Sequence, residues 1–316
     1  MSITAQPVFV HYGCESGAAC CCRLEFDEDE YLVVGTLCGM VYMFNPIDQT
    51  SVSAQKVDKQ SRQVMAVGQY SADILFVHIR TFALIQMKLM KKEKKIYMEV
   101  VRKYDTDHYG FCSAVYYENI FYIPMNANDT NALKRIGEND EYIIDLSSSE
   151  NEKTGNLMTL CAMGNDLLSC CFEDGSICVV DTNQRRVLSK AKLFPEIILS
   201  SAYFNSRLVV SSVQSPLKIL YWTGERTEVE SEILYPPSSG GCSAVCISPC
   251  KRMIGTGYWD GSIRIHSTKT GKIRAYIKFH ETTIHSLSWE SICGRRLLLC
   301  CCKDKTLSIW NPFKDG

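Results

Sequence analysis

The sequence predicts an all-β protein, a seven-bladed β-propeller whose ring is closed by an N-terminal strand. Short runs of alternating apolar and polar residues, separated by turn residues, follow one another along most of the 316 residues. They recur in groups of four at intervals of about 40–45 residues, the period that is typical of propeller blades. One further strand precedes the first group, and the last group is one strand short.

The repeat is plainest near the C-terminus. One unit contains four strand-like runs, at residues 242–247, 253–257, 262–266 and 272–277. The next unit begins again with residues 283–289, 296–301 and 306–310. Turn residues such as Gly, Pro and Asp separate the runs, as expected for an antiparallel meander.

The third strand of each unit follows a tight turn, so it is the easiest element to trace back through the chain. The seven candidates are residues 39–44, 81–85, 141–145, 175–180, 217–222, 262–266 and 306–310. The wide spacing before residue 141 predicts that residues 126–140 are a loop insertion. The narrow spacing after it predicts that the third blade has a stunted or missing outer strand near residues 147–155.

The two ends of the chain complete each other. The final unit has three strands, and residues 6–12 form a spare strand ahead of the first unit. Pairing this strand beside residues 306–310 would close the ring and remove open sheet edges. We therefore expect one domain over residues 1–316, with the closing strand at 6–12 and blades at approximately 18–57, 62–102, 111–150, 156–192, 197–232, 242–278 and 283–310.

The composition limits the classes of function. Lys and Arg total 34 against 35 Asp and Glu, a formal charge of −1, which argues against direct binding to nucleic acid or to anionic membranes. Hydrophobic residues make up 46% of the chain, enough for a packed core. No apolar run approaches the ~20 residues of a membrane-spanning helix, and residues 1–12 do not resemble a secretory signal.

Cysteine is unusually frequent, with 17 residues and no CxxC pair. Without an export signal these thiols are expected to be reduced. Adjacent cysteines, as in residues 20–22 and 300–302, point to opposite faces of a strand and make poor disulfide partners. The sequence therefore predicts a soluble intracellular protein whose cysteines serve mostly as small buried hydrophobes.

Residues 258–265 and 303–310 resemble the ends of WD repeats. In that family a His before the inner strand, a Ser or Thr on the second strand, the turn Asp and a Trp on the third strand form a hydrogen-bonded tetrad with a structural role. The resemblance implies that His280, Asp304 and Trp310 occupy these positions in the last unit.

The match to the tetrad is incomplete elsewhere. In the last unit, Cys300 or Cys302 stands where the hydroxyl is expected. The preceding unit keeps Thr256 and Asp260 but has a histidine in place of the Trp, and the fourth unit keeps Asp174 but has a valine there. Most blades are therefore expected to depend on apolar packing.

Within the WD-repeat family, residues 156–316 are similar to G-protein-beta-like members of the ASTRA-associated kind. The resemblance implies a non-enzymatic scaffold for protein–protein interactions, monomeric within a larger complex, in the cytoplasm and nucleus. The implied partners are co-chaperone and maturation factors that assemble or stabilise phosphatidylinositol-3-kinase-related kinases, together with ASTRA-type chromatin complexes.

Three other functions fit the sequence less well. Substrate receptors of cullin-type ubiquitin ligases resemble WD-repeat proteins with Trp-Asp-x-Arg after the third strand, whereas residues 310–313 read Trp-Asn-Pro-Phe. A true G-protein beta subunit needs an N-terminal coiled-coil helix, for which residues 1–17 are too short. No phosphate loop, nucleophile elbow, HExxH or dinucleotide motif is present, so neither an enzyme nor a cofactor is expected.

Two groups resemble metal motifs. His280 and His285 lie five residues apart at the start of a strand, so their side chains point to opposite faces. Cys242, Cys246 and Cys250 have no obvious fourth ligand, and a structural zinc site needs four. We expect no metal, and interpret the three cysteines as core thiols.

Two features are candidates for a partner surface. Lys91, Lys92, Lys94 and Lys95 crowd a hairpin, which is either a solvated loop or a site for nuclear import or an acidic partner. The acidic residues 25–30 are their possible counterpart. Trp259 lies at the turn of the sixth unit, where it either packs on a neighbouring blade or forms part of a binding surface.

Overall fold

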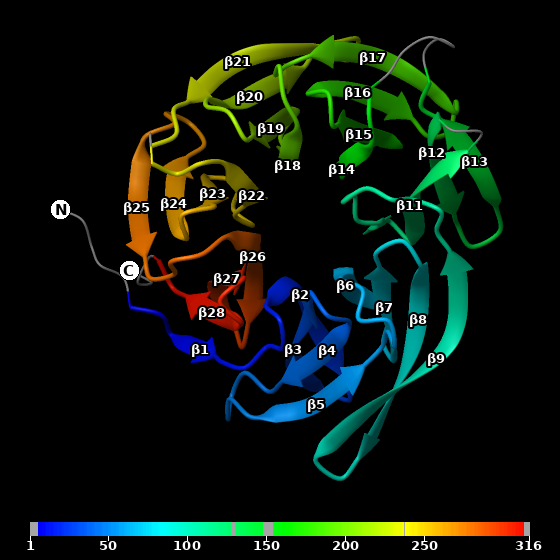
Figure 1. Ribbon diagram of the computed structural model, residues 1–316, viewed down its shortest axis with the longest axis vertical. Coiled ribbons are helices and arrows are strands. Elements are labelled where there is room, and N and C mark those ends of the chain that lie inside the picture. The colour runs from blue at the N-terminus through cyan, green and yellow to red at the C-terminus, as the bar shows by residue number, and fades with distance from the viewer. Residues whose placement is uncertain (1–5, 128–129, 148–153, 237, 313–316) are drawn as a thin grey trace.

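The computed structural model describes residues 6–127, 130–147, 154–236 and 238–312. Its strands form seven four-stranded antiparallel sheets arranged as blades around a central axis (Figure 1). The predicted seven-bladed propeller is thereby confirmed. Among the described residues, no helix is long and apolar enough to span a membrane.

Within each blade the chain runs outward strand by strand. From inner to outer strand, blade one contains β2 (Ala18–Phe26), β3 (Asp29–Thr36), β4 (Met40–Phe44) and β5 (Ser51–Lys56); blade two, β6 (Val64–Ser71), β7 (Ile74–Ile79), β8 (Ala83–Lys92) and β9 (Lys95–Asp105); and blade three, β10 (Val115–Tyr117), β11 (Ile120–Ala127), β12 (Thr130–Ile136) and β13 (Glu141–Asp145). Blade four contains β14 (Leu157–Gly164), β15 (Leu167–Phe172), β16 (Ser176–Asp181) and β17 (Arg186–Lys192); and blade five, β18 (Ile198–Phe204), β19 (Arg207–Ser212), β20 (Leu217–Trp222) and β21 (Thr227–Ile233). Blade six contains β22 (Cys242–Ile247), β23 (Met253–Tyr258), β24 (Ser262–Ser267) and β25 (Ile273–Lys278); and blade seven, β26 (Ile284–Ile292), β27 (Arg295–Cys302), β28 (Thr306–Trp310) and, from the other end of the chain, β1 (Phe9–His11).

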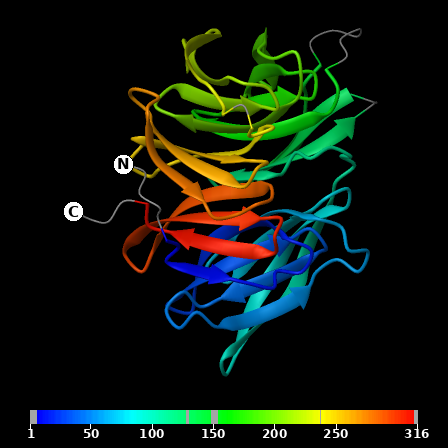
Figure 2. The same cartoon turned by 60° about the vertical axis from the view of Figure 1, so that its left-hand side comes forward.

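The ring closes as predicted between the two ends of the chain. Strand β1 is the outer strand of blade seven and pairs antiparallel with β28, with Val10 opposite Ser308. The Val8 N–H also donates to the carbonyl of Ile309 at 2.7 Å. Figure 2 shows β1 alongside β28. One sheet therefore joins the first described strand of the chain to the last.

The third blade differs from the sequence prediction. Residues 130–136 were expected to lie in a loop insertion, but they form β12, the third strand of the blade. Residues 141–145, expected to be the third strand, form the outer strand β13. The blade is therefore complete, and its outer strand ends before residues 147–155, part of which lies outside the described residues. The third strands begin at residues 40, 83, 130, 176, 217, 262 and 306, an even spacing around the ring.

The core is divided among the junctions between neighbouring blades. Seven clusters of buried apolar side chains are present, and each draws its members from two adjacent blades. The cluster between blades seven and one includes Leu32 and Leu307 and has Phe9 of β1 packed against it. No blade can bury its apolar faces alone, so the ring is stable only when every junction is made.

The cysteines belong largely to these junctions. All 17 are free thiols; eleven are buried, four are partly buried, and only Cys250 and Cys293 are exposed. Cys250 thus departs from the expectation that it is a core thiol. Burial also raises the pKa of the Cys242 thiol to about 12, which keeps it protonated and unreactive at neutral pH.

We expect thiol titration of the unfolded protein to give the same total, near the full 17, with and without reductant. In the folded protein, Cys250 and Cys293 should react with a thiol reagent well before the rest, because a buried thiol is inaccessible. Titration with Ellman's reagent, before and after unfolding, measures both. A deficit in the unreduced, unfolded sample would show disulfides and contradict this assignment.

Two buried histidines lie at the junction of blades two and three. His78 accepts a hydrogen bond at Nδ1 from the Ala114 N–H at 3.0 Å. Burial, with a smaller contribution from His108, lowers the pKa of His78 to about 3. Burial, followed by the charge of Arg80, lowers the pKa of His108 to about 4. Both imidazoles are therefore neutral in the folded protein at physiological pH.

We expect the protein to lose stability as the pH falls from about 6.5 to 5. Below a pKa of about 6.5 the unfolded chain protonates these histidines while the folded protein does not, so acid favours unfolding by up to ~1.4 kcal/mol per pH unit for each group. Melting temperature measured between pH 7.5 and 5 tests this, with His78→Gln as the control. That variant should flatten the profile; an unchanged slope would exclude His78 as a source.

Candidate interaction face and its supporting tetrad

One face of the ring carries the loops that precede the inner strands and the turns between second and third strands. This follows from the antiparallel meander, because strands one and three of a blade start at the same end. The face therefore receives a loop and a turn from each blade. His280 lies in such a loop, and Asp174, Asp260 and Asp304 lie in such turns.

In blade seven the predicted tetrad residues come together. His280 lies 2.6 Å from Asp304, between Nδ1 and Oδ2, and 2.8 Å from Ser308, between Nε2 and Oγ. The Trp310 indole N–H donates to the same Ser308 hydroxyl at 2.7 Å. The chain of contacts joins the loop before β26, the turn after β27 and the third strand β28. It holds the blade's edge on this face in one geometry.

The hydroxyl comes from Ser308, which was not among the residues expected from the sequence. Neither Cys300 nor Cys302 bridges His280 to Trp310; Ser308 does, and it lies opposite Cys300 in the sheet. Ser308 precedes Trp310 by two residues on one strand, so both side chains point to the same side. This alternation of side chains along a strand could have identified Ser308 as a neighbour of the Trp310 ring from the sequence. In this blade the hydroxyl is therefore supplied by the third strand, not by the second strand as expected from the resemblance.

The charge of Asp304 is maintained by its neighbours. Burial raises the pKa of this carboxyl, but hydrogen bonds with His280 and Thr306 outweigh it, so the pKa lies below the usual range. His280, Cys302 and Asp304 place possible ligand atoms within 4.8 Å of one another. His280 is hydrogen-bonded to Asp304 and Ser308, and the Cys302 thiol donates to the Thr282 carbonyl, so these hydrogen bonds account for the cluster structurally.

The aspartates of blades four and six have a local role. Asp260 Oδ1 accepts the Ser262 N–H at 2.9 Å and the Ser262 hydroxyl at 2.6 Å. Asp174 accepts the same pair from Ser176, at 2.8 and 2.6 Å. Thr256 instead donates to the carbonyl of Arg264, so it does not join Asp260 as the resemblance implied. What the turns share is an aspartate two residues before the hydroxyl that begins the third strand.

A cavity of about 440 Å³ opens at the centre of the ring. All seven blades contribute to its lining, mostly through residues at or just before the start of their inner strands. Most of these residues are small or polar, such as Ser113, Ser200 and Ser243. The two large aromatic side chains among them are Phe111 and Trp259. The cavity therefore has two aromatic anchors in a wall that mixes small polar side chains with aliphatic ones such as Met65 and Leu199.

Trp259 is fixed yet accessible. Its main-chain N–H donates to the carbonyl of Gly241 at 3.1 Å, and its ring lies so close to Gly241 that an added Cβ would meet it at 3.1 Å. The residue remains 39% exposed. It therefore packs on a glycine loop of its own blade and still presents a ring surface to the cavity.

Phe111 is held from beneath by Arg80. The guanidinium carbon lies 3.7 Å from the centre of the Phe111 ring, and the same side chain donates to the carbonyls of Tyr109 and Gly110 at 3.3 Å. Phe111 is 53% exposed, and Tyr109 beside it is also exposed. The loop before β10 thus presents aromatic side chains from a fixed position. This anchor was not among the predicted surface residues.

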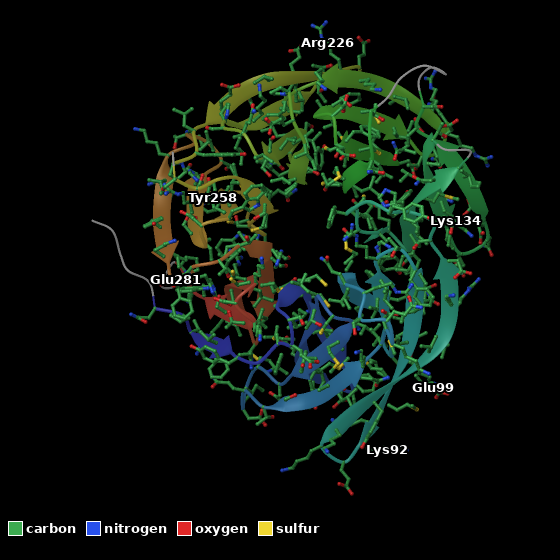
Figure 3. The ribbon with its side chains drawn as sticks, in the orientation of Figure 1. Lys92, Glu99, Lys134, Arg226, Tyr258 and Glu281 are labelled. Atoms are coloured by element: carbon green, nitrogen blue, oxygen red, sulfur yellow. The ribbon has the colours of Figure 1, made fainter. Side chains whose placement is uncertain are left out.

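The predicted lysines lie on a different part of the molecule. Strands β8 and β9 extend beyond the ring as a hairpin, with Lys92 near its far end (Figure 3). Lys91 is paired within the chain, 2.8 Å from Asp27 and 2.9 Å from Asp29. The acidic loop is therefore the partner of Lys91, while Lys92, Lys94 and Lys95 remain exposed beyond it.

We expect Asp260→Ala to lower the melting temperature and Trp259→Ala to leave it nearly unchanged. Removing the carboxylate leaves the buried Ser262 N–H and hydroxyl without an acceptor, which should lower the free energy of unfolding by ~1–3 kcal/mol. Trp259 is partly exposed, so its removal should cost little stability. Asp260→Asn, which retains an acceptor oxygen, is the control and should melt between Asp260→Ala and the native protein. Early melting of Trp259→Ala alone, measured by circular dichroism, would reverse these roles.

Comparison with protein families locates WD repeats in this chain. A family model described as "WD domain, G-beta repeat" matches residues 231–267 and 271–311. Each match starts in or just before the outer strand of one blade and continues through the first three strands of the next. The sequence repeat therefore spans two blades, in agreement with the position of β1, which precedes blade one in the chain but is the outer strand of blade seven.

Two curated relatives are distant and partial. The chain is 23% identical over 148 residues to guanine nucleotide-binding protein subunit beta-like protein 1 of Mus musculus, covering 46% of this chain and 44% of that protein. It is 30% identical over 76 residues to nuclear distribution protein PAC1-1 of Uncinocarpus reesii (strain UAMH 1704), covering 24% and 17%. The matches thus span less than half the length of these relatives. The expected similarity to a G-protein-beta-like protein is confirmed.

Solved structures match over the whole ring. The WD40 β-propeller domain of Doa1 superimposes with a TM-score of 0.75 at 13% identity, covering 99% of this chain and 98% of that one. The computationally designed Ika8 protein gives a TM-score of 0.69 at 14% identity, covering 96% and 99%. At these identities the likeness establishes the fold alone.

Proposed function

We propose that this WD-repeat propeller is a non-enzymatic scaffold that binds partner proteins on the face around the central cavity. The observation that carries the proposal is the pair of fixed, exposed aromatic side chains, Phe111 and Trp259, at the rim of that cavity. Aromatic residues held in place at low entropic cost are frequent hot spots of protein interfaces. The rigid ring beneath them keeps a bound partner in one orientation.

The finer proposal concerns the partners. We propose that they are co-chaperone and maturation factors of phosphatidylinositol-3-kinase-related kinases, and ASTRA-type chromatin assemblies, in the cytoplasm and nucleus. Its support is the similarity to a G-protein-beta-like protein, a relative that matches over less than half of the chain.

The experiment is affinity capture of the tagged chain from its native cells, quantified by mass spectrometry. We compare the native protein with Phe111→Ala/Trp259→Ala and with Tyr221→Ala, an exposed aromatic of β20 in blade five that serves as the matched control. Kinases of this class and their maturation factors should be recovered with the native protein and the control, and lost with the double variant.

Two results would contradict the proposal in different ways. Equal recovery with the double variant, once its melting temperature is shown to be native, would remove the aromatic face from the interaction. Recovery of a cullin adaptor in place of kinase-maturation factors would leave the scaffold role and reject the named partners.

A further inference from the structure

A smaller cavity, of about 260 Å³, lies between blades six and seven. It is bounded by the turn between β22 and β23, the first residues of β27 and the residues that follow β28. In an antiparallel meander these segments lie at the opposite end of the blades from the loops around the central cavity. Pro249, Met253, Trp289 and Pro312 supply an apolar wall. The cavity is therefore on the face of the ring opposite the two aromatic anchors.

Cys250 lines this cavity with its thiol held by a hydrogen bond. The Ser248 hydroxyl oxygen accepts the Met253 main-chain N–H at 3.1 Å, so its own hydrogen can be donated to the Cys250 sulfur, 3.3 Å away. This hydrogen bond, followed by the main chain of Arg252 and the charge of Arg296, outweighs burial and lowers the pKa of the Cys250 thiol. A larger fraction of Cys250 is therefore the nucleophilic thiolate at neutral pH than of an ordinary cysteine.

The charge at the cavity is positive. Arg252 and Arg296 both line it, both are exposed, and neither forms an ion pair with a carboxylate of the described chain. No Asp or Glu is present among the described residues of the lining. A guanidinium group binds a carboxylate through two parallel hydrogen bonds. The cavity thus combines a nucleophilic sulfur, an apolar wall and two cations that can bind carboxylates.

Cys293, the other exposed thiol, has the opposite surroundings. It lies in the turn between β26 and β27, where its main-chain N–H donates to the Glu30 carboxylate at 2.6 Å. Burial, followed by the charge of Glu30, raises the pKa of the Cys293 thiol. The other 15 cysteines are buried or partly buried. An anionic reagent that attacks thiolates is therefore directed to Cys250.

From this geometry we infer that Cys250 is a modification site, which forms a mixed disulfide with an anionic low-molecular-weight thiol of the glutathione class. The Cys250 thiolate attacks one sulfur of glutathione disulfide, and a Cys250–glutathione S–S bond forms as the S–S bond of the reagent breaks. The departing glutathione thiolate takes a proton from solvent, so the reagent is the only oxidant. Arg252 and Arg296 hold carboxylates of the glutathionyl group beside the apolar wall. This site is independent of the proposed capture of partners on the opposite face.

The probe is glutathione disulfide, added to the reduced full chain at neutral pH. Intact-mass spectrometry follows the adduct, and peptide mapping locates it. We expect one glutathionyl group on Cys250, added at least roughly threefold faster than on Cys293, because a lower pKa raises the thiolate fraction more than it lowers the nucleophilicity. Cys250→Ser should remove this adduct, Cys293→Ser should leave it unchanged, and dithiothreitol should restore the unmodified mass.

A neutral reagent separates binding in the cavity from the reactivity of the sulfur. Bis(2-hydroxyethyl) disulfide undergoes the same exchange but has no carboxylates for the arginines. Arg252→Gln/Arg296→Gln should lower the ratio of the glutathione disulfide rate to the neutral disulfide rate by at least roughly threefold, a modest change because exposed ion pairs are weak. Lys94→Gln/Lys95→Gln, an equal charge change at the end of the β8–β9 hairpin, should leave the ratio unchanged. All four side chains are exposed, so both variants should fold, which circular dichroism checks.

Three results would overturn the inference. The first is the absence of a glutathione adduct on Cys250. The second is modification of Cys293 or of any other cysteine as fast as Cys250. The third is an unchanged rate ratio in Arg252→Gln/Arg296→Gln, which would show that Cys250 reacts as an exposed thiol without binding in the cavity. None of these results bears on capture through Phe111 and Trp259.

Discussion

A chain lacking residues 1–12 should aggregate or melt far below the full-length protein. The deletion removes β1 and leaves β28 as an open edge in blade seven. It also takes Phe9 from the junction between blades seven and one, and His11 from its stacked position 4.0 Å from the Phe44 ring. Because each junction depends on both of its blades, the loss should spread to blade one. Melting temperature and light scattering measure the effect.

A shorter deletion provides the control. Removing residues 1–7 keeps Val8 and the whole of β1, including the Val8 hydrogen bond to Ile309. This variant should melt near the full-length protein, which would assign the effect to the closing strand rather than to the length of the terminus. If the 1–12 deletion also melted like the native chain and stayed monomeric, the closure would contribute little to stability.

The pairing of the two chain ends could be predicted from the number of strands in the sequence. Three strands at one end and a spare strand at the other leave a single pairing that removes both edges. The strand register, with Val10 opposite Ser308, could not be derived, because it depends on how the loop before β2 positions β1.

The third blade was misread because β12 looks polar. Lys134 and Arg135 lie at its centre, and the sequence offers no sign that they can be placed in a strand. In the structure each finds a partner at the β13 side of the sheet: Lys134 lies 2.6 Å from Glu141, and Arg135 lies 2.5 Å from Asp140. The Arg135 guanidinium also lies 5.0 Å from the centre of the Tyr142 ring. These contacts join β12 to residues of β13 and of the turn before it, so single-strand periodicity could not reveal them.

The candidate sites also include some residues that could be predicted from the sequence and others that could not. His280, Asp304 and Trp310 could be identified because each holds a fixed place in a repeat. Phe111 could not, since its fixed position depends on Arg80, which belongs to the preceding blade. Local spacing identifies residues that act within one blade. Surfaces between blades require the assembled ring.

Trp310→Ala should be the most destabilising single substitution among the tetrad residues. The side chain is fully buried in the junction between blades six and seven, with the Phe279 ring centre 5.5 Å from its own. Truncating a buried Trp to Ala typically costs ~3–5 kcal/mol, from lost transfer free energy and the cavity left behind. Denaturant unfolding of the two proteins gives the difference in the free energy of unfolding. A loss below ~1 kcal/mol would show that the junction collapses around the gap.

Ser308→Ala then separates the hydrogen bonds from the packing. It leaves the buried Trp310 N–H and His280 Nε2 without the shared hydroxyl, for an expected cost of ~1–3 kcal/mol. Cys300 lies directly opposite Ser308 on β27, the strand from which WD repeats are expected to supply the hydroxyl. In the Ser308→Ala background, Cys300→Ser should therefore recover part of the lost free energy of unfolding. In the native background, the same substitution should not increase the free energy of unfolding. If Cys300→Ser changes both backgrounds equally, the two positions are uncoupled, and the third-strand serine is not a substitute for the missing second-strand hydroxyl.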